Sequence, residues 1–176
     1  MIFSETPLPS AYVIEPERLE DARGFFARSW CQREFTARGL TARIVQCDIS
    51  FNKLKGTLRG LHYQVAPHQE AKVVRCTMGA VYDVIVDLRA ESPTFRQHFG
   101  VVLSAQDRRM LFVPEGFANG FQTLEDDSEV LYLMSEFYSP EHAAGVRWND
   151  GALAIKWPLP PSVMSERDRS YPDLTR

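Results

Sequence analysis

The chain of 176 residues has room for one hydrophobic core, because single domains commonly hold roughly 100 to 200 residues. Hydrophobic residues make up 44% of it and charged residues 24%, which lies near the globular average and argues against disorder. The formal net charge of −3 gives no broad basic surface for nucleic acid, and neither a signal peptide nor a membrane-spanning apolar run is visible. We therefore expect one globular domain over residues 1–176, located in the cytoplasm.

The first expected element is a short helix near residues 31–39, where Gly39 offers a C-terminal stop. From residue 70 to 138, runs of β-branched and aromatic residues alternate with Gly, Pro and Asp, which is typical of an all-β sandwich or barrel. A second short helix is predicted after Ser139, with Pro140 at its first position, and a third in the tail. The pattern favours an all-β jelly roll with short peripheral helices around a ligand cavity. The expected strand segments are 71–79, 80–95, 98–107, 108–116, 120–127 and 129–140.

The densest polar cluster occupies residues 56–75. Strict alternation in the strand-like segment 58–64 places Arg59 on one face and His62 on the other. In the following strand Lys72 shares a face with Val74 and Cys76. The interior of a barrel would bring Lys72 near His62.

The same cluster resembles the first metal-binding motif of the cupin superfamily, since Gly56 precedes His62 by six positions. Gln64 stands where the second histidine ligand belongs, Glu70 comes too late, and Asn119 replaces the last histidine of the second motif. Sites of this type need about three or four ligands, so we expect neither a metal nor a cofactor. Taken alone, His62 is more often a hydrogen-bonded core residue; without a metal, its free ring nitrogen can accept a proton.

Six segments, taken in order, resemble the dTDP-4-dehydrorhamnose 3,5-epimerase family over nearly the whole chain. The resemblance implies a jelly-roll homodimer whose N-terminal segment is exchanged with its partner. It also implies a pocket that epimerises a 4-keto-6-deoxyhexose attached to a nucleoside diphosphate, in deoxysugar or polysaccharide biosynthesis. The segments are DARGFFARSW, LRGLHYQ, AKVVRCTMGAVYDVIVDLRAESPTF, LFVPEGFANGF, VLYL with FYSPEH, and VRWNDGALAIKWP.

The family resemblance implies four catalytic residues. A carbon beside a ketone can lose a proton because the charge spreads onto the ketone oxygen, and this reaction needs a base, an oxyanion stabiliser and an acid. His62 stands at the family's base position, and Asp168 matches the aspartate that orients it. Lys72 falls where a cation faces the enolate oxygen, and Tyr132 matches the tyrosine that returns a proton to the opposite face. Without the resemblance, these three partners would be an exposed tail carboxylate, a solvated lysine and a buried aromatic residue.

The resemblance also implies contacts to the nucleotide. Arg23 and Arg59 match the residues on the diphosphate, where a guanidinium pairs with phosphate oxygens. Phe26 matches a residue near the nucleoside, Gln46 a polar contact, and Tyr138 an aromatic residue beside the base.

Three positions depart from the family pattern. Arg28 stands where the family usually carries glutamate, and Asp48, with Cys47 before it, replaces an acidic and amide pair. Asn119 replaces a second active-site histidine, which faces Asp83 in the family. The identity of the nucleotide base and the choice between epimerisation at C3 alone and at C3 and C5 therefore stay open.

Three other functions fit parts of the sequence. A related ketoisomerase would move hydrogen between C3 and C4 of the same substrate class, and a binding module would keep the nucleotide pocket without catalysis. A metal-dependent cupin enzyme would need metal in the purified protein.

Overall fold

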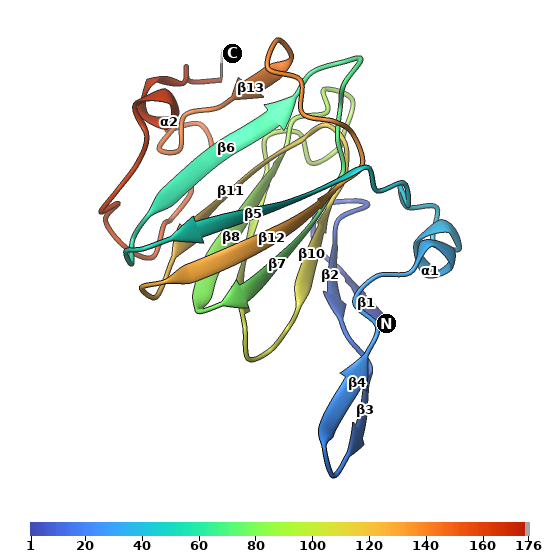
Figure 1. Cartoon of the computed structure of the whole chain (residues 1–176). Helices are drawn as coiled ribbons and strands as arrows, with labels where there is room; N and C mark the ends of the chain where they lie inside the picture. The colour runs from blue at the N-terminus through green and yellow to red at the C-terminus, as the bar shows by residue number, and fades with distance from the viewer. Residues whose placement is uncertain (175–176) are drawn as a thin grey trace.

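The computed structural model describes residues 1–174, which form two antiparallel β-sheets packed face to face (Figure 1). One sheet has six strands in the order β1-β2-β10-β7-β12-β5, and the other has five in the order β13-β6-β11-β8-β9. The arrangement confirms the predicted all-β jelly roll. The strands are β1 (Ile2–Glu5), β2 (Tyr12–Glu15), β3 (Arg18–Asp21), β4 (Gly24–Ala27), β5 (Gln46–Asn52), β6 (Leu58–Gln64), β7 (Lys72–Met78), β8 (Ala80–Asp87), β9 (His98–Ser104), β10 (Met110–Val113), β11 (Phe117–Thr123), β12 (Ser128–Met134) and β13 (Ala143–Gly145).

The inner faces of the two sheets form the main core. Side chains of alternate residues meet there, as the period of two in a strand requires. Val74 and Cys76 of β7 contribute from one sheet, and Ile85 of β8 and Phe121 of β11 from the other. Lys72 shares the inward face of β7 with Val74, as predicted, and this places its ammonium at the end of the core.

Both sheets are also covered on their outer faces. The helix α1 (Gln32–Thr36) inserts Phe35 against Ile14 and Phe112 on the six-stranded sheet. The C-terminal segment, which contains the helix α2 (Glu166–Ser170), packs over the five-stranded sheet, where Leu61 is buried with Val146 and other apolar residues of that segment. The predicted helices near residues 31–39 and in the tail are thereby confirmed.

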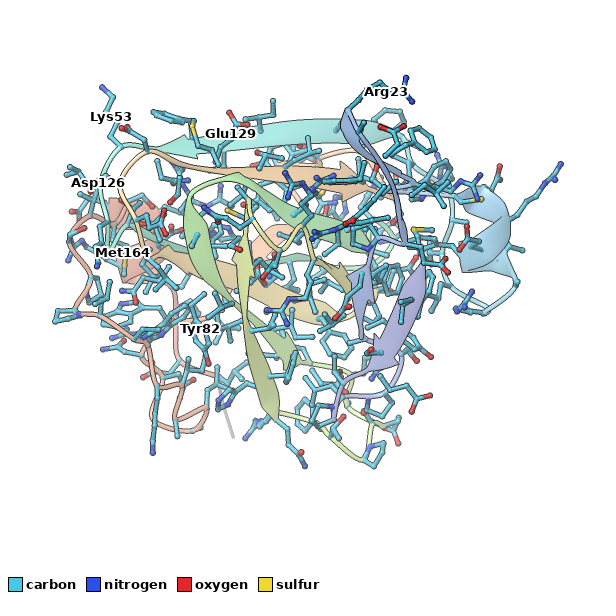
Figure 2. The ribbon with its side chains drawn as sticks, turned by 90° about the horizontal axis from the view of Figure 1, so that it is seen from below. Arg23, Lys53, Tyr82, Asp126, Glu129 and Met164 are labelled. Carbon is cyan, nitrogen blue, oxygen red and sulfur yellow. The ribbon has the colours of Figure 1, made fainter. Side chains whose placement is uncertain are left out.

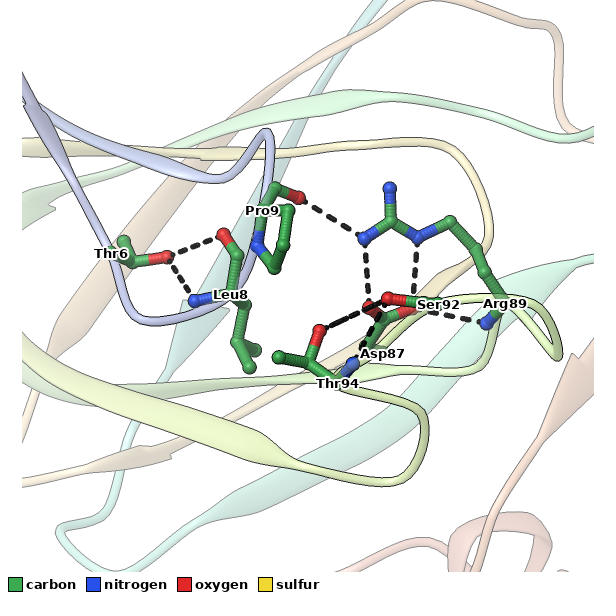
Figure 3. Close-up of polar contacts among 7 residues, drawn as sticks. All are labelled: Thr6, Leu8, Pro9, Asp87, Arg89, Ser92 and Thr94. Carbon is green, nitrogen blue, oxygen red and sulfur yellow. Dashed lines mark hydrogen bonds and ion pairs between the residues drawn. The ribbon is translucent and has the colours of Figure 1, made fainter.

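A buried carboxylate fixes the N-terminal segment and the loop after β8 (Figure 3). Asp87 accepts hydrogen bonds from Arg89, Ser92 and Thr94, while Arg89 donates to the carbonyl oxygen of Pro9. Although burial favours the neutral acid, these hydrogen bonds outweigh it and lower the pKa of Asp87 to about 2. The predicted strand segment 80–95 therefore ends at Asp87, because the chain turns there around this charge.

The two strands β3 and β4 form a separate hairpin that projects from the body of the molecule (Figure 1). Its apolar side chains Leu19 and Phe26 are 68% and 72% exposed. Leaving large apolar side chains in water is unfavourable, so this hairpin presents a surface suited to contact with another molecule.

The helix predicted after Ser139 is wrong. Residues 139–142 form one turn, in which the hydroxyl of Ser139 bonds the ring of His142, and the chain then pairs with β6 as β13. Pairing with a sheet edge satisfies more backbone groups than an isolated turn of helix would. Neither helix among residues 1–174 is long and apolar enough to cross a membrane. The last two residues of the predicted domain 1–176 lie outside the described residues.

Candidate active site

A cavity of about 520 Å³ opens between the two sheets, with walls from β5, β6, β7, β11 and β12. A second cavity of about 310 Å³ adjoins it and shares Asp48, His62, Lys72 and Met134 with it. The first cavity is lined by Asp48, Ile49, Ser50, Phe51, Arg59, His62, Lys72, Asn119, Gly120, Phe121, Tyr132 and Met134. The structure thus brings together most of the side chains that the sequence singled out.

Arg59 and His62 line the same cavity, which corrects the prediction that alternation separates them. The register between β6 and β11 shifts here: His62 pairs with Asn119, but Arg59 pairs with Phe121. At the shift, Gly60 adopts φ +124°, and a Cβ there would lie 2.5 Å from the Cα of Gly120. The close approach of two glycines permits the irregularity, beside which Arg59 lines the cavity.

His62 and Asp168 form a hydrogen-bonded pair. The Nε2 atom of His62 lies 2.6 Å from Oδ1 of Asp168, whose side chain is 5% exposed. Ser165 caps the short helix α2 by accepting from the backbone N–H of Asp168, which fixes the carboxylate against β6. Burial alone would raise the pKa of Asp168, but the bond to His62 helps to keep it below its usual value. Because a carboxylate only accepts, Nε2 carries a proton, and in the neutral form of the ring the lone pair is therefore on Nδ1.

Lys72 is buried beside Glu70, with Nζ 2.8 Å from Oε1. Both side chains lie at 10% exposure or less, so the ammonium is held in one position where the low dielectric strengthens its field. The solvated alternative for Lys72 is wrong. The pairing with Glu70, a residue weighed above only as a metal ligand, was not predicted, although the spacing of two residues along the chain was a signal for it.

Tyr132 presents its phenol to the cavity from β12. Burial is the main reason that its pKa lies far above the usual value, and the nearby Asp83 adds to the effect. The phenol is therefore a protonated hydrogen-bond donor at neutral pH. It lies opposite Asp48 of β5 in the strand register, so Asp48 shares its face and lines both cavities.

Asn119 and Asp83 form a second buried pair. The amide Nδ2 of Asn119 donates to Oδ1 of Asp83 at 2.6 Å and to the carbonyl oxygen of Val84 at 3.2 Å. Asp83 is fully buried, which raises its pKa to about 8 despite the Asn119 bond and the charge of Lys72. It is thus a neutral acid at pH 7, lying behind Asn119, which lines the cavity.

Polar side chains continue from the first cavity into the adjoining one. Gln46 donates to Asp48 at 2.6 Å and accepts from the backbone N–H of Tyr138 at 3.2 Å. Arg167 lies beside the phenol oxygen of Tyr138 at 3.4 Å. Arg167 was not predicted from the sequence, although it directly precedes Asp168 in the chain. The adjoining cavity therefore combines an aromatic ring, an amide and a guanidinium.

Three predicted nucleotide-binding residues lie away from both cavities in this single chain. Arg23 stands at the end of the β3–β4 hairpin (Figure 2), and it pairs with Asp21. Phe26 is exposed on the same hairpin, and Arg28 pairs with Glu34 of α1 at 3.1 Å. Phe26 and Arg28 line a separate cavity of about 230 Å³ near the N-terminus. Within one chain, the hairpin does not contribute to the site around His62.

Among residues 1–174, no group of three or more His, Cys, Asp or Glu side chains is arranged to hold a metal ion. The carboxylate beside His62 contacts its Nε2 atom, and the position of the lost cupin histidine is filled by the amide of Asn119.

Comparison with known proteins bears on this cavity. The family model described as dTDP-4-dehydrorhamnose 3,5-epimerase matches residues 5–176. The enzyme of that name from Salmonella typhimurium is 44% identical, with 99% of this chain and 96% of the relative covered. The crystal structure of the dTDP-4-dehydrorhamnose 3,5-epimerase from Bacillus anthracis, with TDP and pyrophosphate bound, is 44% identical in sequence and has a TM-score of 0.94. The match covers 98% of this chain and 99% of that one.

A more distant structure is that of a 3′-monoepimerase from Streptomyces bikiniensis in complex with dTDP-quinovose. It is 30% identical with a TM-score of 0.86, and the match covers 96% of this chain and 85% of that one. The fold, the cavity and these matches agree, and the chain belongs to the dTDP-4-dehydrorhamnose 3,5-epimerase family.

Proposed function

We propose that this chain epimerises a nucleoside-diphosphate 4-keto-6-deoxyhexose by removing a proton from a carbon beside the C4 ketone. The observation that carries the proposal is the His62–Asp168 pair, which opens onto a cavity that also holds Lys72 and Tyr132. The imidazole side chain is 41% exposed and lines the cavity, while the carboxylate behind it is buried. A buried carboxylate behind an accessible imidazole is suited to a general base.

The proposed reaction moves one proton off the sugar and another onto it. Nδ1 of His62 takes the proton from C3, and Asp168 stabilises the resulting imidazolium. The electron pair moves onto the C4 oxygen, where the ammonium of Lys72 stabilises the enolate. The phenol of Tyr132 then donates a proton to the opposite face of C3, which inverts that carbon. Exchange with solvent restores the protonation of both side chains, and no cofactor takes part.

The nucleotide part of the substrate is proposed to lie toward the rim of the cavity. Arg59 lines the cavity and donates its Nε–H to Asn52 at 2.7 Å and one Nη2–H to the carbonyl oxygen of Phe51 at 3.4 Å. Its remaining N–H groups are suited to a phosphate. The ring of Tyr138, with Gln46 and Asp48 near it, offers a stacking surface for the base. The complex of a relative with TDP and pyrophosphate supports a thymidine nucleotide.

We further propose that two copies assemble, and that the β3–β4 hairpin of each one completes the site of the other. β5 is an edge strand beside the cavity, and its side chains Ile49 and Phe51 are 64% and 44% exposed. An exposed apolar edge and an exposed apolar hairpin are suited to cover each other. Arg23 and Phe26 would then reach the nucleotide from the partner. Arg28, on the short stretch after the hairpin, would add a positive charge near it.

Nuclear magnetic resonance of substrate in deuterated water tests the proposed reaction. Incubation with dTDP-4-keto-6-deoxyglucose is expected to place deuterium at C3, or at C3 and C5, with the ketone still at C4. A ketone found at C3 would instead show a ketoisomerase. Binding without any deuterium uptake would show a binding module, and loss of activity to a chelator would show a metal enzyme.

The number of carbons epimerised and the location in the cell remain predictions. One of the related proteins of known structure is a 3′-monoepimerase, so epimerisation at C3 alone has a precedent among relatives. Deuterium at C3 without C5 would assign this chain to the same type. Cell fractionation would test the predicted cytoplasmic location.

A further inference from the structure

The side chain of Asn119 has a fixed orientation in the cavity wall. Its Nδ2 atom faces two oxygens, one from Asp83 at 2.6 Å and one from the carbonyl of Val84 at 3.2 Å. A carbonyl oxygen can only accept a hydrogen bond, so the amide atom facing Val84 must be the nitrogen. Both N–H bonds are then used within the protein.

The other end of the amide is left open. Among residues 1–174, Oδ1 of Asn119 receives no hydrogen bond, and it is not one of the buried unpaired atoms. Asn119 lines the cavity, next to His62 in the paired strand. Asn119 therefore offers the cavity an oxygen that accepts a hydrogen bond, and it has no free N–H to donate.

This oxygen joins the carboxylate of Asp48 and the ring of His62 as an acceptor in a cavity that also holds several donors. The ammonium of Lys72, the phenol of Tyr132 and the guanidinium of Arg59 are donors, which are suited to a ketone oxygen and a diphosphate. A 4-keto-6-deoxyhexose bound through its C1 phosphate has hydroxyl groups only at C2 and C3. These hydroxyls are the sugar groups that can donate to an amide oxygen.

We infer that Asn119, held by Asp83 and Val84, determines sugar specificity by accepting a hydrogen bond from the C2 or C3 hydroxyl of the hexose. This inference rests on the proposed function, because it assumes that a hexose occupies the cavity. It gives Asn119 no proton-transfer role and excludes it as a donor to the enolate oxygen. Asp83 is a positioning residue, because among residues 1–174 the hydrogen bond of its carboxyl group goes to the amide nitrogen of Asn119 and its other oxygen is buried.

Binding measurements with unreactive ligands test this assignment. The ligands are dTDP-quinovose, whose C4 carries a hydroxyl in place of the ketone, and its 2-deoxy, 3-deoxy and 4-deoxy analogues. Wild-type protein is expected to bind either the 2-deoxy or the 3-deoxy analogue about five-fold more weakly than the parent. Asn119→Ala is expected to bind the parent and that analogue equally. Gln46→Ala, a matched control in the adjoining cavity, is expected to keep the five-fold difference.

Two results would overturn the assignment. The first is an equal loss of affinity in wild-type protein and Asn119→Ala for both the 2-deoxy and 3-deoxy analogues. The second is a difference between the two proteins with the 4-deoxy analogue alone, since the amide would then address the reacting position. Asn119→Leu, which keeps the shape of the side chain, replaces the alanine variant if thermal unfolding shows the latter to be unfolded. Failure of wild-type protein to bind dTDP-quinovose would contradict the proposed function as well, whereas the two results above leave it standing.

Discussion

At the scale of single residues, His62 and Tyr132 are proposed to act from opposite sides of the sugar carbon. If His62 alone removes and returns the proton, the carbon exchanges hydrogen with solvent but is not inverted. Tyr132→Phe removes only the phenol oxygen, so it separates the two steps.

Tyr132→Phe is expected to lower formation of the epimerised product by about a hundredfold or more, because it removes a general acid. Deuterium uptake at C3 from deuterated water is expected to persist, since His62 and Lys72 remain. Nuclear magnetic resonance reports label and configuration in the same sample. Equal loss of exchange and inversion would contradict separate roles for the two side chains.

Asp83 is expected to make stability depend on pH. Its pKa is about 8 in the folded protein, because burial disfavours the carboxylate, and near 3.9 in an unfolded chain. Between these values the folded chain holds a proton that the unfolded chain has released. The contribution of Asp83 to the free energy of unfolding is fully present below pH 4. It falls as the pH rises to 8, with a slope of at most about 1.4 kcal/mol per pH unit.

Asp83→Asn, an uncharged replacement of the same shape, is expected to remove this slope. Urea unfolding of both proteins at several pH values between 4 and 9 isolates the effect, because Lys72, Tyr132 and the other titrating groups are common to both. A difference in stability that stays constant across this range would show that Asp83 does not carry a buried proton.

At the scale of elements, the irregularity between β6 and β11 decides which side chains reach the cavity. Gly60→Ala is expected to destabilise the protein by about 3 kcal/mol, since the added Cβ meets backbone of Gly120 at 2.5 Å and the left-handed φ is unfavourable. Activity is expected to fall with it, because Arg59 and His62 flank the shift.

Gly24→Ala provides the matched control for this substitution. Gly24 has the same φ of +124°, but a Cβ there meets nothing within 4 Å. Gly24→Ala should therefore destabilise the protein only by the cost of the unfavourable backbone angle, without the cost of close packing. Thermal unfolding compares the two variants, and an equal shift in Tm would show that close packing at Gly60 is unimportant.

The sequence predicted elements well where a simple period applied. The alternating runs from residue 71 onward became strands, and Lys72 points inward with Val74 as its period requires. Arg59 could not be placed in this way, because a shift in register depends on two glycines from different strands. The turn after Ser139 was missed because pairing with β6, a long-range contact, overrides a local helix signal. Asp168 could be assigned only through the family resemblance, since it lies 106 residues from His62.

At the scale of the whole molecule, the site is proposed to use residues from two chains. If Arg23 reaches the partner's cavity, two inactive variants should complement each other. A mixed dimer of His62→Ala and Arg23→Ala has one site in which both residues are wild type. With random pairing, a mixture refolded together is expected to recover about a quarter of wild-type activity.

Variants refolded separately and then mixed without exchange are the control, and are expected to stay inactive. Light scattering with size-exclusion chromatography establishes that a dimer is present. Recovery of no activity in verified mixed dimers would show that Arg23 and His62 do not serve a site shared between chains.

The central claim is that His62 is the base of a sugar-nucleotide epimerase. The most direct measurement is deuterium uptake by dTDP-4-keto-6-deoxyglucose in deuterated water, comparing wild-type protein with His62→Asn at equal occupancy by substrate. We predict that wild-type protein labels C3 with the ketone still at C4, and that the variant binds the same substrate but slows labelling by at least about a hundredfold. Labelling at the wild-type rate by a folded His62→Asn protein would contradict the account.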